Sequence, residues 1–312
     1  MADLTYVDPD APSTTMLVWE LGGLRGADRA GDVALCCYTG LVTDTGRFQY
    51  QNTDAAALRA ASEMAAAAYA KGFTRLGFSG HGYTAFDESY CMSRADVSAY
   101  LQEVAGLKAE YAGKMEIDAG VEQDFYATEP TEGFAYVIGS VHYLYQDGRY
   151  LPVDEAEAVT AQAVREHFGG SNYRYVQAYF ETVAQVVAKT HADIIGHFDL
   201  VTKFNEGGKH FDMTDKRFWH AALEAMEELL RWDKPFEINT GAMYRGLRTE
   251  PYPSLALLKE LQKRGGRILL SSDSHDTASL GYGFAEMARA AKELGFRTVQ
   301  VWTPQGWEET PL

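Results

Sequence analysis

The feature that most constrains the fold is an alternation, from about residue 48 onward, of short apolar runs with longer helix-like segments. Each apolar run ends in a polar stretch, and a helix-like segment follows it. Strands that alternate with helices in this way are typical of a parallel sheet, and here we expect the sheet to close into a barrel. The apolar runs predict strands at Arg75–Ser79, Met115–Ala119, Tyr136–Ser140, Asp193–Ile195, Phe236–Asn239, Ile268–Leu270 and Thr298–Trp302, with a less clear strand at Gly46–Gln51.

The segments between these strands have the lengths and the terminal residues of helices. Ala55–Lys71 is rich in alanine, has Asp54 in the N-cap position and is closed by Gly72. The arginine-bearing stretch Thr240–Thr249 is predicted to be a loop. The remaining helices are expected at Arg94–Tyr111, Asp154–His167, Tyr173–Lys189, Lys216–Arg231, Ser254–Arg264 and Thr277–Leu294.

The same alternation predicts a domain division. Residues 1–47 form an N-terminal extension of unclear role, and residues 48–312 form a single barrel domain. Within the extension, Val33–Val42 is a candidate strand. Its adjacent Cys36 and Cys37 would point to opposite faces, so buried small hydrophobic residues are favoured over a metal or redox pair.

Composition and charge exclude several classes of protein. The formal net charge of −16 argues against nucleic acid as a bulk partner, and it requires that an anionic substrate be met by local positive charge. No apolar run approaches the length of a membrane span, and the N-terminus lacks the basic and apolar regions of a signal peptide. Three cysteines give no disulfide framework. We therefore expect a cytoplasmic protein with no membrane or nucleic-acid partner, and its oligomeric state is left open.

Polar side chains gather where the predicted strands end. In a parallel sheet these ends line the mouth at which ligands bind. Asp273 and His275, two apart on an extended stretch, can project to the same side and hold a metal ion together. The residues at or just beyond strand ends are His81, Glu122, His142, His197, Asp273 and His275.

Imidazoles and carboxylates in one place suit zinc, iron or manganese, and a carboxylate such as Glu122 can bridge two ions. Two or more ions could polarise a phosphoryl oxygen, generate hydroxide from bound water and stabilise a leaving oxygen. The other four histidines are expected to be surface or packing residues, because they lie in predicted helices, turns or loops. They are His167, His191, His210 and His220.

Seven stretches of the chain resemble the PHP superfamily and, within it, the histidinol-phosphatase branch. They read GFSGH, FDESYCMS, GVEQDFY, YVIGSVHY, DIIGHFDLVTKFNE, FEINTGAMYRGLRTEPYPS and ILLSSDSH, and the resemblance extends from about Ala65 to Leu294. It implies a distorted TIM-like (β/α)7 barrel with a trinuclear metal centre at the C-terminal face of the strands. It also implies hydrolysis of L-histidinol phosphate to histidinol and phosphate in histidine biosynthesis.

The resemblance further implies roles for individual residues of the metal centre. Glu122 is the expected bridging carboxylate, and His142 and His197 complete one metal site with it. Asp273 shares a second site with Glu122. The residues expected to act in catalysis are Glu122, Asp273 and His275.

Two more groups of residues follow from the resemblance. His81 and His275 would belong to another metal site. Arg245, in the loop after the sixth barrel strand, would meet the substrate phosphate as a planar bidentate donor. Arg248 and Lys203 are further candidates for binding the phosphate.

The chain departs from the family pattern at the first strand, where the family carries His-x-His. Counted without gaps, these positions fall on Gln49 and Gln51, whereas the earlier candidate strand would place them on Cys36 and Tyr38. Gly80 also stands where the family's GFSDH has an acid. Because an amide oxygen is a weak zinc ligand beside imidazole, the first metal site is expected to be weakened or lost.

Two functional hypotheses remain. The first is a metal-dependent phosphomonoesterase acting on histidinol phosphate or a similar small phosphomonoester, with one to three Zn, Mn or Fe ions, since the site of Glu122, His142 and His197 is whole. The second is a catalytically impaired or repurposed barrel that binds a metal or a phosphorylated ligand without efficient turnover. A metal-dependent hydrolase of another ester or amide is a further alternative. Metal content together with phosphate release from histidinol phosphate distinguishes them.

Overall fold

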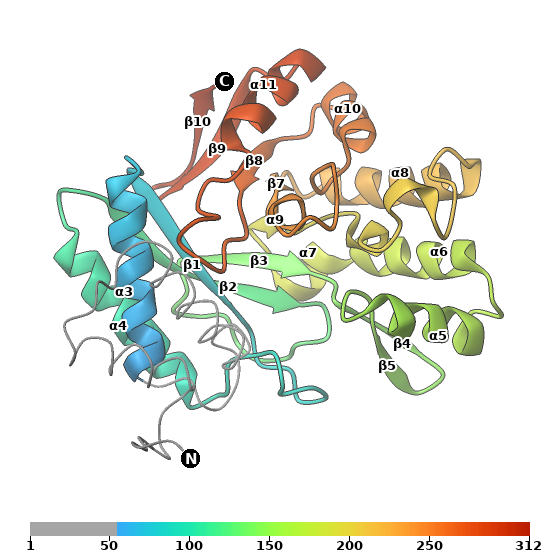
Figure 1. The fold of residues 1–312 in the computed structure, drawn as a ribbon, viewed down its shortest axis with the longest axis horizontal. Helices are drawn as coiled ribbons and strands as arrows, with labels where there is room; N and C mark the ends of the chain where they lie inside the picture. Colours follow the sequence, from blue (N-terminus) through green and yellow to red (C-terminus); the bar gives the residue numbers. More distant parts are fainter. Residues whose placement is uncertain (1–54) are drawn as a thin grey trace, which may run out of the picture. The chain divides into compact units, whose positions relative to one another are not determined.

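The computed structural model of the chain describes residues 55–312, and Figure 1 labels their helices and strands. These residues form two compact units. The first comprises residues 55–120, 132–134 and 274–280, and the second comprises residues 121–131, 135–273 and 281–312. The extension, the strand at Gly46–Gln51 and the Asp54 cap lie outside the described residues, so the single barrel domain from residue 48 stays a prediction.

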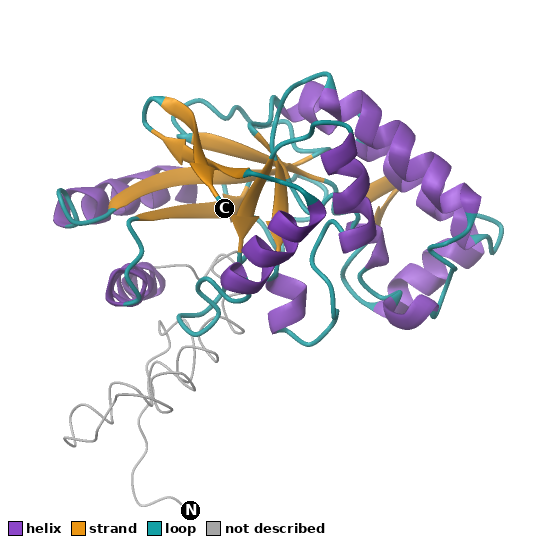
Figure 2. Cartoon of the chain, turned by 90° about the horizontal axis from the view of Figure 1, so that it is seen from above, coloured by secondary structure: helices purple, strands orange, loops and turns teal. Residues whose placement is uncertain are grey.

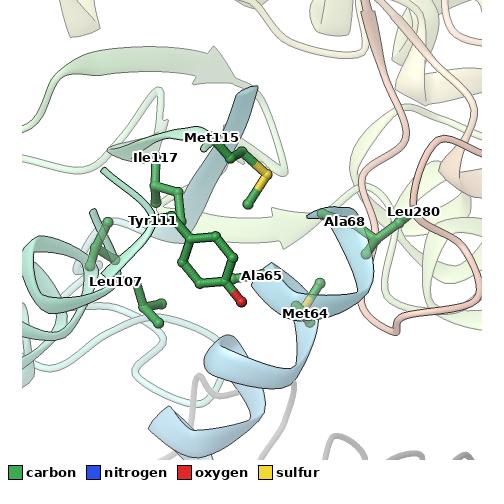
Figure 3. Close-up of a cluster of buried hydrophobic side chains, with 9 residues drawn as sticks. Met64, Ala65, Ala68, Leu107, Tyr111, Met115, Ile117 and Leu280 are labelled. Atoms are coloured by element: carbon green, nitrogen blue, oxygen red, sulfur yellow. The ribbon is translucent and has the colours of Figure 1, made fainter. Parts of the chain in front are cut away.

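The first unit contains helix α3 (Ala55–Ala70), strand β1 (Arg75–His81) and helix α4 (Asp96–Glu110). Helix α3 ends at Ala70, one residue before the predicted Lys71, because Gly72 has a φ of 85°, a backbone conformation that glycine adopts without steric cost. Figure 3 shows the core that the two helices share with the start of the next strand. Its labelled side chains are Met64, Ala65, Ala68, Leu107, Tyr111, Met115, Ile117 and Leu280.

Six strands form one sheet in the order β1, β2 (Glu116–Asp124), β3 (Tyr136–Ser140), β6 (Ile194–Ile195), β7 (Phe236–Asn239) and β8 (Ile268–Ser271). Strand β2 runs from the first unit into the second. In the second unit, β3 pairs with β6, β6 with β7 and β7 with β8, all in parallel, as the alternation of strands and helices predicts. The predicted bounds of β3 and β7 are confirmed to the residue.

The six-stranded sheet of residues 55–312 agrees with the predicted distorted barrel, and the further strand expected at Gly46–Gln51 lies outside these residues. One prediction about the sheet needs correction. The predicted strand Thr298–Trp302 does form, as β9 (Thr298–Thr303). It pairs antiparallel with β10 (Gly306–Pro311) in a separate two-stranded sheet, since the turn between them brings the chain straight back.

The second unit also contains helices that bury one apolar face each. Along α8 (Lys216–Leu230) the buried residues recur three or four apart, as an amphipathic helix requires, and α6 (Asn172–Val183) follows the same rule. The rings of Phe180 and Phe218 meet edge to face between these two helices, with centroids 5.7 Å apart. The other helices are α5 (Glu157–His167), α7 (Val186–Thr190), α10 (Leu255–Lys263) and α11 (Phe284–Leu294).

Three helix and loop predictions differ from the structure. The segment predicted as one helix over Tyr173–Lys189 is divided into α6 and α7. Helix α11 begins at Phe284 rather than Thr277, because positive φ angles at Gly281 and Gly283 keep the preceding segment out of helical geometry. The loop Thr240–Thr249 contains the short helix α9 (Gly241–Tyr244).

A hairpin between β3 and α5 was not predicted. Strands β4 (Tyr143–Gln146) and β5 (Arg149–Pro152) pair antiparallel around Asp147 and Gly148, both at positive φ. Asp-Gly is a strong signal for this type of turn.

Strand β10 is the last strand of the chain, and Figure 2 shows it as the strand that ends at the label C. Within residues 55–312, no helix is both long and apolar enough to span a bilayer.

Candidate metal centre

Three of the predicted ligands meet at one edge of the second unit's sheet. Glu122 lies within β2, and His142 and His197 each lie two residues beyond the end of a strand, β3 and β6 respectively. The Nε2 atom of His197 is 3.0 Å from Glu122 Oε1, and the Nε2 atom of His142 is 3.4 Å from the same oxygen. This convergence follows from the consecutive order of β2, β3 and β6 in the sheet. Glu122 was expected just beyond its strand, but β2 extends to Asp124 and contains it.

The three side chains are largely shielded from water. Glu122 is 13% exposed, His142 10% and His197 8%. The two imidazole rings meet edge to face with their centroids 4.9 Å apart. In such surroundings, electrostatic interactions are stronger than at a protein surface.

Asp124 contacts one of these ligands and was not selected from the sequence. Its side chain is almost completely buried, and its Oδ2 accepts a hydrogen bond from the backbone N–H of His142 at 2.8 Å. The same oxygen lies 3.6 Å from Nδ1 of His142, on the ring edge opposite Glu122. Asp124 is two residues from Glu122 on one strand, so the two carboxylates share a face, and this spacing was the available signal.

Glu237 and Asn239 in β7 were missed as well. Glu237 is buried, and its Oε1 accepts a hydrogen bond from the backbone N–H of His197 at 2.6 Å. Asn239 Nδ2 donates to the same oxygen at 3.2 Å. A charged residue between the apolar Phe236 and Ile238 of this short strand was the signal, since an acid is rarely buried without a polar partner.

The negative charges of this site oppose the lowering effect of burial on the pKa values of its two histidines. Burial alone would lower the pKa of His142, but the nearby carboxylates of Asp124 and Glu122 raise it to about 9. Burial likewise lowers the pKa of His197, and the hydrogen bond to Glu122 outweighs it, so this pKa is also raised. Burial raises the pKa of Glu237, with a further increase from the negative charges of Glu122 and Asp273. The surroundings of the two imidazoles therefore favour positive charge.

The donor atoms of this site fit a divalent transition metal. Two imidazole nitrogens and one carboxylate oxygen are a ligand set found in zinc sites, and it also suits manganese and iron. A cation would also meet the preference for positive charge noted above.

Asp154 and Lys203 form an ion pair in the same unit. Lys203 Nζ donates to the carbonyl oxygen of Asp154 at 2.7 Å and to its Oδ2 at 2.9 Å. Burial would raise the pKa of Asp154, but the positive charges of His142 and Lys203 lower it to about 2. Lys203, predicted to bind phosphate, is thus held by a carboxylate, and its phosphate role stays a prediction.

Arg245 and Asp273 also form an ion pair, with Nη2 and Oδ2 3.1 Å apart. Asp273 has a φ of 44°, which is unusual for a residue with a side chain. A Cβ atom on Gly241 would lie 2.7 Å from Asp273 Oδ2 and 2.9 Å from Arg245 Nη2. The close approach of the two charged groups therefore requires glycine at position 241. The predicted metal role of Asp273 and phosphate role of Arg245 remain predictions.

Arg248 is buried, unlike Arg245. Its Nη1 donates to both the carbonyl and the hydroxyl oxygen of Thr202, and its guanidinium lies over the ring of Tyr252. These contacts tie the loop after β7 to the segment that follows β6. The phosphate role predicted for Arg248 stays a prediction.

His81 and His275 belong to the first unit. His81 is the last residue of β1, and its ring contacts Tyr90 edge to face with centroids 5.4 Å apart. His275 lies in the half-buried segment after β8. Their roles as metal ligands stay predictions.

The departures from the family pattern are only partly visible in the structure. The four candidate first-strand positions Gln49, Gln51, Cys36 and Tyr38 lie outside the described residues. Gly80 is described, and a Cβ atom there would lie 2.8 Å from Sδ of Met92. An acid at position 80 would therefore require the flexible Met92 side chain to move.

Of the four histidines expected at the surface or in packing contacts, three lie beside a carboxylate. His210 and His220 contact Glu157 and Glu224, at 2.8 Å and 3.2 Å. His167 contacts Asp147, and His191 ends helix α7 in a left-handed conformation.

Comparisons with known proteins place the chain in a family. The family model described as PHP domain matches residues 50–241. The chain is 30% identical over 249 residues to "Probable histidinol-phosphatase" of Deinococcus radiodurans, covering 76% of this chain and 88% of that protein. It is 28% identical over 195 residues to a Schizosaccharomyces pombe protein of the same name, and there it spans only 62% of the relative's length.

A solved structure is similar as well. It is the crystal structure of histidinol phosphate phosphatase from Lactococcus lactis, complexed with zinc, L-histidinol and phosphate. The TM-score is 0.60 at 21% identity, and the match covers 79% of this chain and 92% of that chain. The likeness confirms the predicted α/β fold of the distorted TIM-barrel type.

Proposed function

Because this chain belongs to the PHP superfamily, in its histidinol-phosphatase branch, we propose that it is a metal-dependent phosphomonoesterase that hydrolyses L-histidinol phosphate to histidinol and phosphate. The observation that carries the proposal is the convergence of His142 Nε2 and His197 Nε2 on a single oxygen of Glu122. The relatives named histidinol-phosphatase support a PHP-family phosphatase.

In this proposal Glu122, His142 and His197 hold a divalent ion. When bound, such an ion would polarise a phosphoryl oxygen and acidify a water molecule. The burial of the three side chains keeps bulk water from weakening their interactions with charge. Asp273, His81 and His275 are proposed as further ligands, with Asp273 and His275 acting beside Glu122 in catalysis.

Arg245 is the proposed phosphate ligand. Its side chain is 25% exposed, so a ligand in solution can reach it. The planar guanidinium can donate two parallel hydrogen bonds to one phosphate group. Arg245 also supplies the local positive charge that a protein of net charge −16 needs for an anionic substrate. Lys203 and Arg248 are proposed as secondary contributors.

The test combines metal analysis of the purified protein with phosphate release from L-histidinol phosphate. We expect at least one transition-metal ion per chain, measurable phosphate release, and loss of both in Glu122→Gln. The matched control is Glu116→Gln, at the exposed start of the same strand, which should change neither quantity. A metal-free wild-type protein without phosphate release would contradict the proposal.

The second candidate is a barrel that binds a metal or a phosphorylated ligand without efficient turnover. Gly80 at the place of the family's acid favours it, as does the absence of histidine at Gln49 and Gln51. Metal content with no phosphate release would support this candidate.

If Gln49 and Gln51 occupy the family's histidine positions, Gln49→His with Gln51→His should raise metal content. The rate of phosphate release should increase at least about tenfold, which corresponds to about 1.4 kcal/mol of activation free energy. If neither quantity changes, that alignment is wrong, and Cys36 and Tyr38 become the next positions to test.

A further inference from the structure

The two histidines of the candidate metal centre are held by the backbone in the same way. The N–H of His142 donates to Asp124 Oδ2 at 2.8 Å, and the N–H of His197 donates to Glu237 Oε1 at 2.6 Å. Each acceptor lies on the strand beside the one that its histidine follows: Asp124 on β2 beside β3, and Glu237 on β7 beside β6. The same arrangement thus occurs twice.

The position of these N–H groups explains why a side chain is needed. Both histidines lie two residues beyond the last residue of their strands. A buried N–H at that point has left the regular ladder of the sheet and must find another acceptor. At both positions a buried carboxylate on the adjacent strand supplies it. A backbone held in this way limits how far the imidazole can move.

Burial makes carboxylates a costly choice for this purpose. Asp124 is 1% exposed and Glu237 is 3% exposed. Removing a carboxylate from water is unfavourable unless hydrogen bonds and neighbouring positive charge compensate. The hydrogen bond that each carboxylate accepts from a histidine N–H supplies part of this compensation.

Two contacts around Glu237 indicate that its position is tightly defined. Asn239 Nδ2 donates to the oxygen that accepts the His197 N–H. The N–H of His197 donates to the same oxygen, so two donors fix its place.

We propose that Asp124 and Glu237 are positioning residues, which hold the backbones of His142 and His197 so that both Nε2 atoms face the same oxygen of Glu122. The inference rests on the proposed function, because it assumes that these three side chains bind a metal ion. By holding the ligands in place beforehand, the two carboxylates raise the affinity for the ion.

The experiment measures the zinc dissociation constant by competition with a chelator, together with thermal stability. Glu237→Met removes the acceptor at similar volume, whereas Glu237→Gln keeps an acceptor oxygen. We expect Glu237→Met to weaken zinc binding about 10–100-fold and Glu237→Gln to remain within about threefold of wild type. Asp124→Ala and Asp124→Asn should differ in the same way.

Asp193 offers a matched control. Its Oδ2 accepts a hydrogen bond from the backbone N–H of Val137 at 3.1 Å, but Asp193 lies just before β6, at the opposite end of that strand from His197. Asp193→Ala should lower stability and leave the zinc dissociation constant unchanged. A merely structural contribution of Glu237 would give the same result as Asp193, and that result would overturn the proposal.

A measurement on the wild-type protein covers the case in which a variant fails to fold. In amide hydrogen exchange followed by NMR, the N–H groups of His142 and His197 should exchange slowly, because both are bonded to buried carboxylates. Fast exchange at both would overturn the proposal. Failure of the wild-type protein to bind zinc would instead contradict the proposed function, so the two failures are distinguishable.

Discussion

Two regions of the second unit carry the predicted chemistry, and they are built differently. We call Glu122, Asp124, His142, His197 and Glu237 the carboxylate–histidine cluster. It lies on strands or within two residues of a strand end, and its three proposed ligands are no more than 13% exposed. Every one of its charged groups has a polar partner within the cluster.

The second region, which we call the arginine pair, consists of Gly241, Arg245 and Asp273. Its charged side chains come from loops after β7 and β8, and they are 25% and 28% exposed. Asp273 has a positive φ, and the close approach of the two charged groups depends on glycine at position 241. The comparison suggests that the cluster is fixed before a ligand arrives, whereas an incoming phosphate must compete with Asp273 for Arg245.

The largest effect is expected from breaking the cluster itself. His197→Ala removes one of two imidazole ligands, and metal affinity should fall by more than about 100-fold, since loss of a mere outer partner already costs about 10–100-fold. Inorganic phosphate binding by the metal-free protein should be unchanged, because Arg245 is untouched. Zinc titration of the variant measures this change, and an unaltered zinc affinity would show that His197 is not a metal ligand.

The next effect tests the arginine pair alone. Arg245→Lys replaces a bidentate donor by a point charge, so binding of inorganic phosphate should weaken by roughly 1.5–3 kcal/mol if a charged hydrogen bond is lost. Calorimetric titration with phosphate measures this change. Arg217→Lys, at an exposed arginine on α8, is the control and should have no effect. Equal affinities in wild type and Arg245→Lys would rule out the assignment.

A smaller effect is expected from crowding the arginine pair. Gly241→Ala places a methyl group against both charged groups, and overpacking of this kind should lower the free energy of unfolding by about 1–3 kcal/mol. Gly106→Ala is the control, because its Cβ would meet nothing within 4 Å in the helix α4. It should stabilise the protein by about 0.5–1 kcal/mol. Denaturant unfolding measures both, and zinc affinity should stay the same in each variant.

The smallest effect concerns pH. The folded-state pKa of Asp154 is lowered to about 2 from the ordinary value of 3.8. Its contribution to stability is therefore present above pH 3.8 and is lost as the pH falls towards 2. Relative to Asp154→Asn, the wild-type protein should lose roughly 1–2 kcal/mol of unfolding free energy across this window. Parallel pH profiles for the two proteins would show that Lys203 and the histidines do not hold this carboxylate ionised.

Sequence reasoning found the elements whose signal is local. Strands β3 and β7 follow from short apolar runs, and helix α3 ends just before the glycine that predicted its end. Glu122, His142 and His197 were found because the ends of consecutive parallel strands must lie close together. The hairpin of β4 and β5 was missed although its Asp-Gly turn is visible in the sequence.

Contacts between distant residues could not be predicted in the same way. The pairing of Arg245 with Asp273 joins two loops 28 residues apart, and its geometry depends on the backbone conformation of Asp273. The hydrogen bonds that Asp124 and Glu237 accept from the N–H groups of His142 and His197 depend on where each strand ends. A one-dimensional pattern shows that such carboxylates are present, but the register of neighbouring strands decides what they touch.

The central claim is that Glu122, His142 and His197 form a metal site. Anomalous diffraction at the zinc edge, from crystals of the zinc-loaded protein, tests it most directly. We expect a peak within coordination distance, about 2.0–2.2 Å, of both Nε2 atoms and of a Glu122 oxygen. Bound zinc with its peak elsewhere, or no peak among these three side chains, would contradict it.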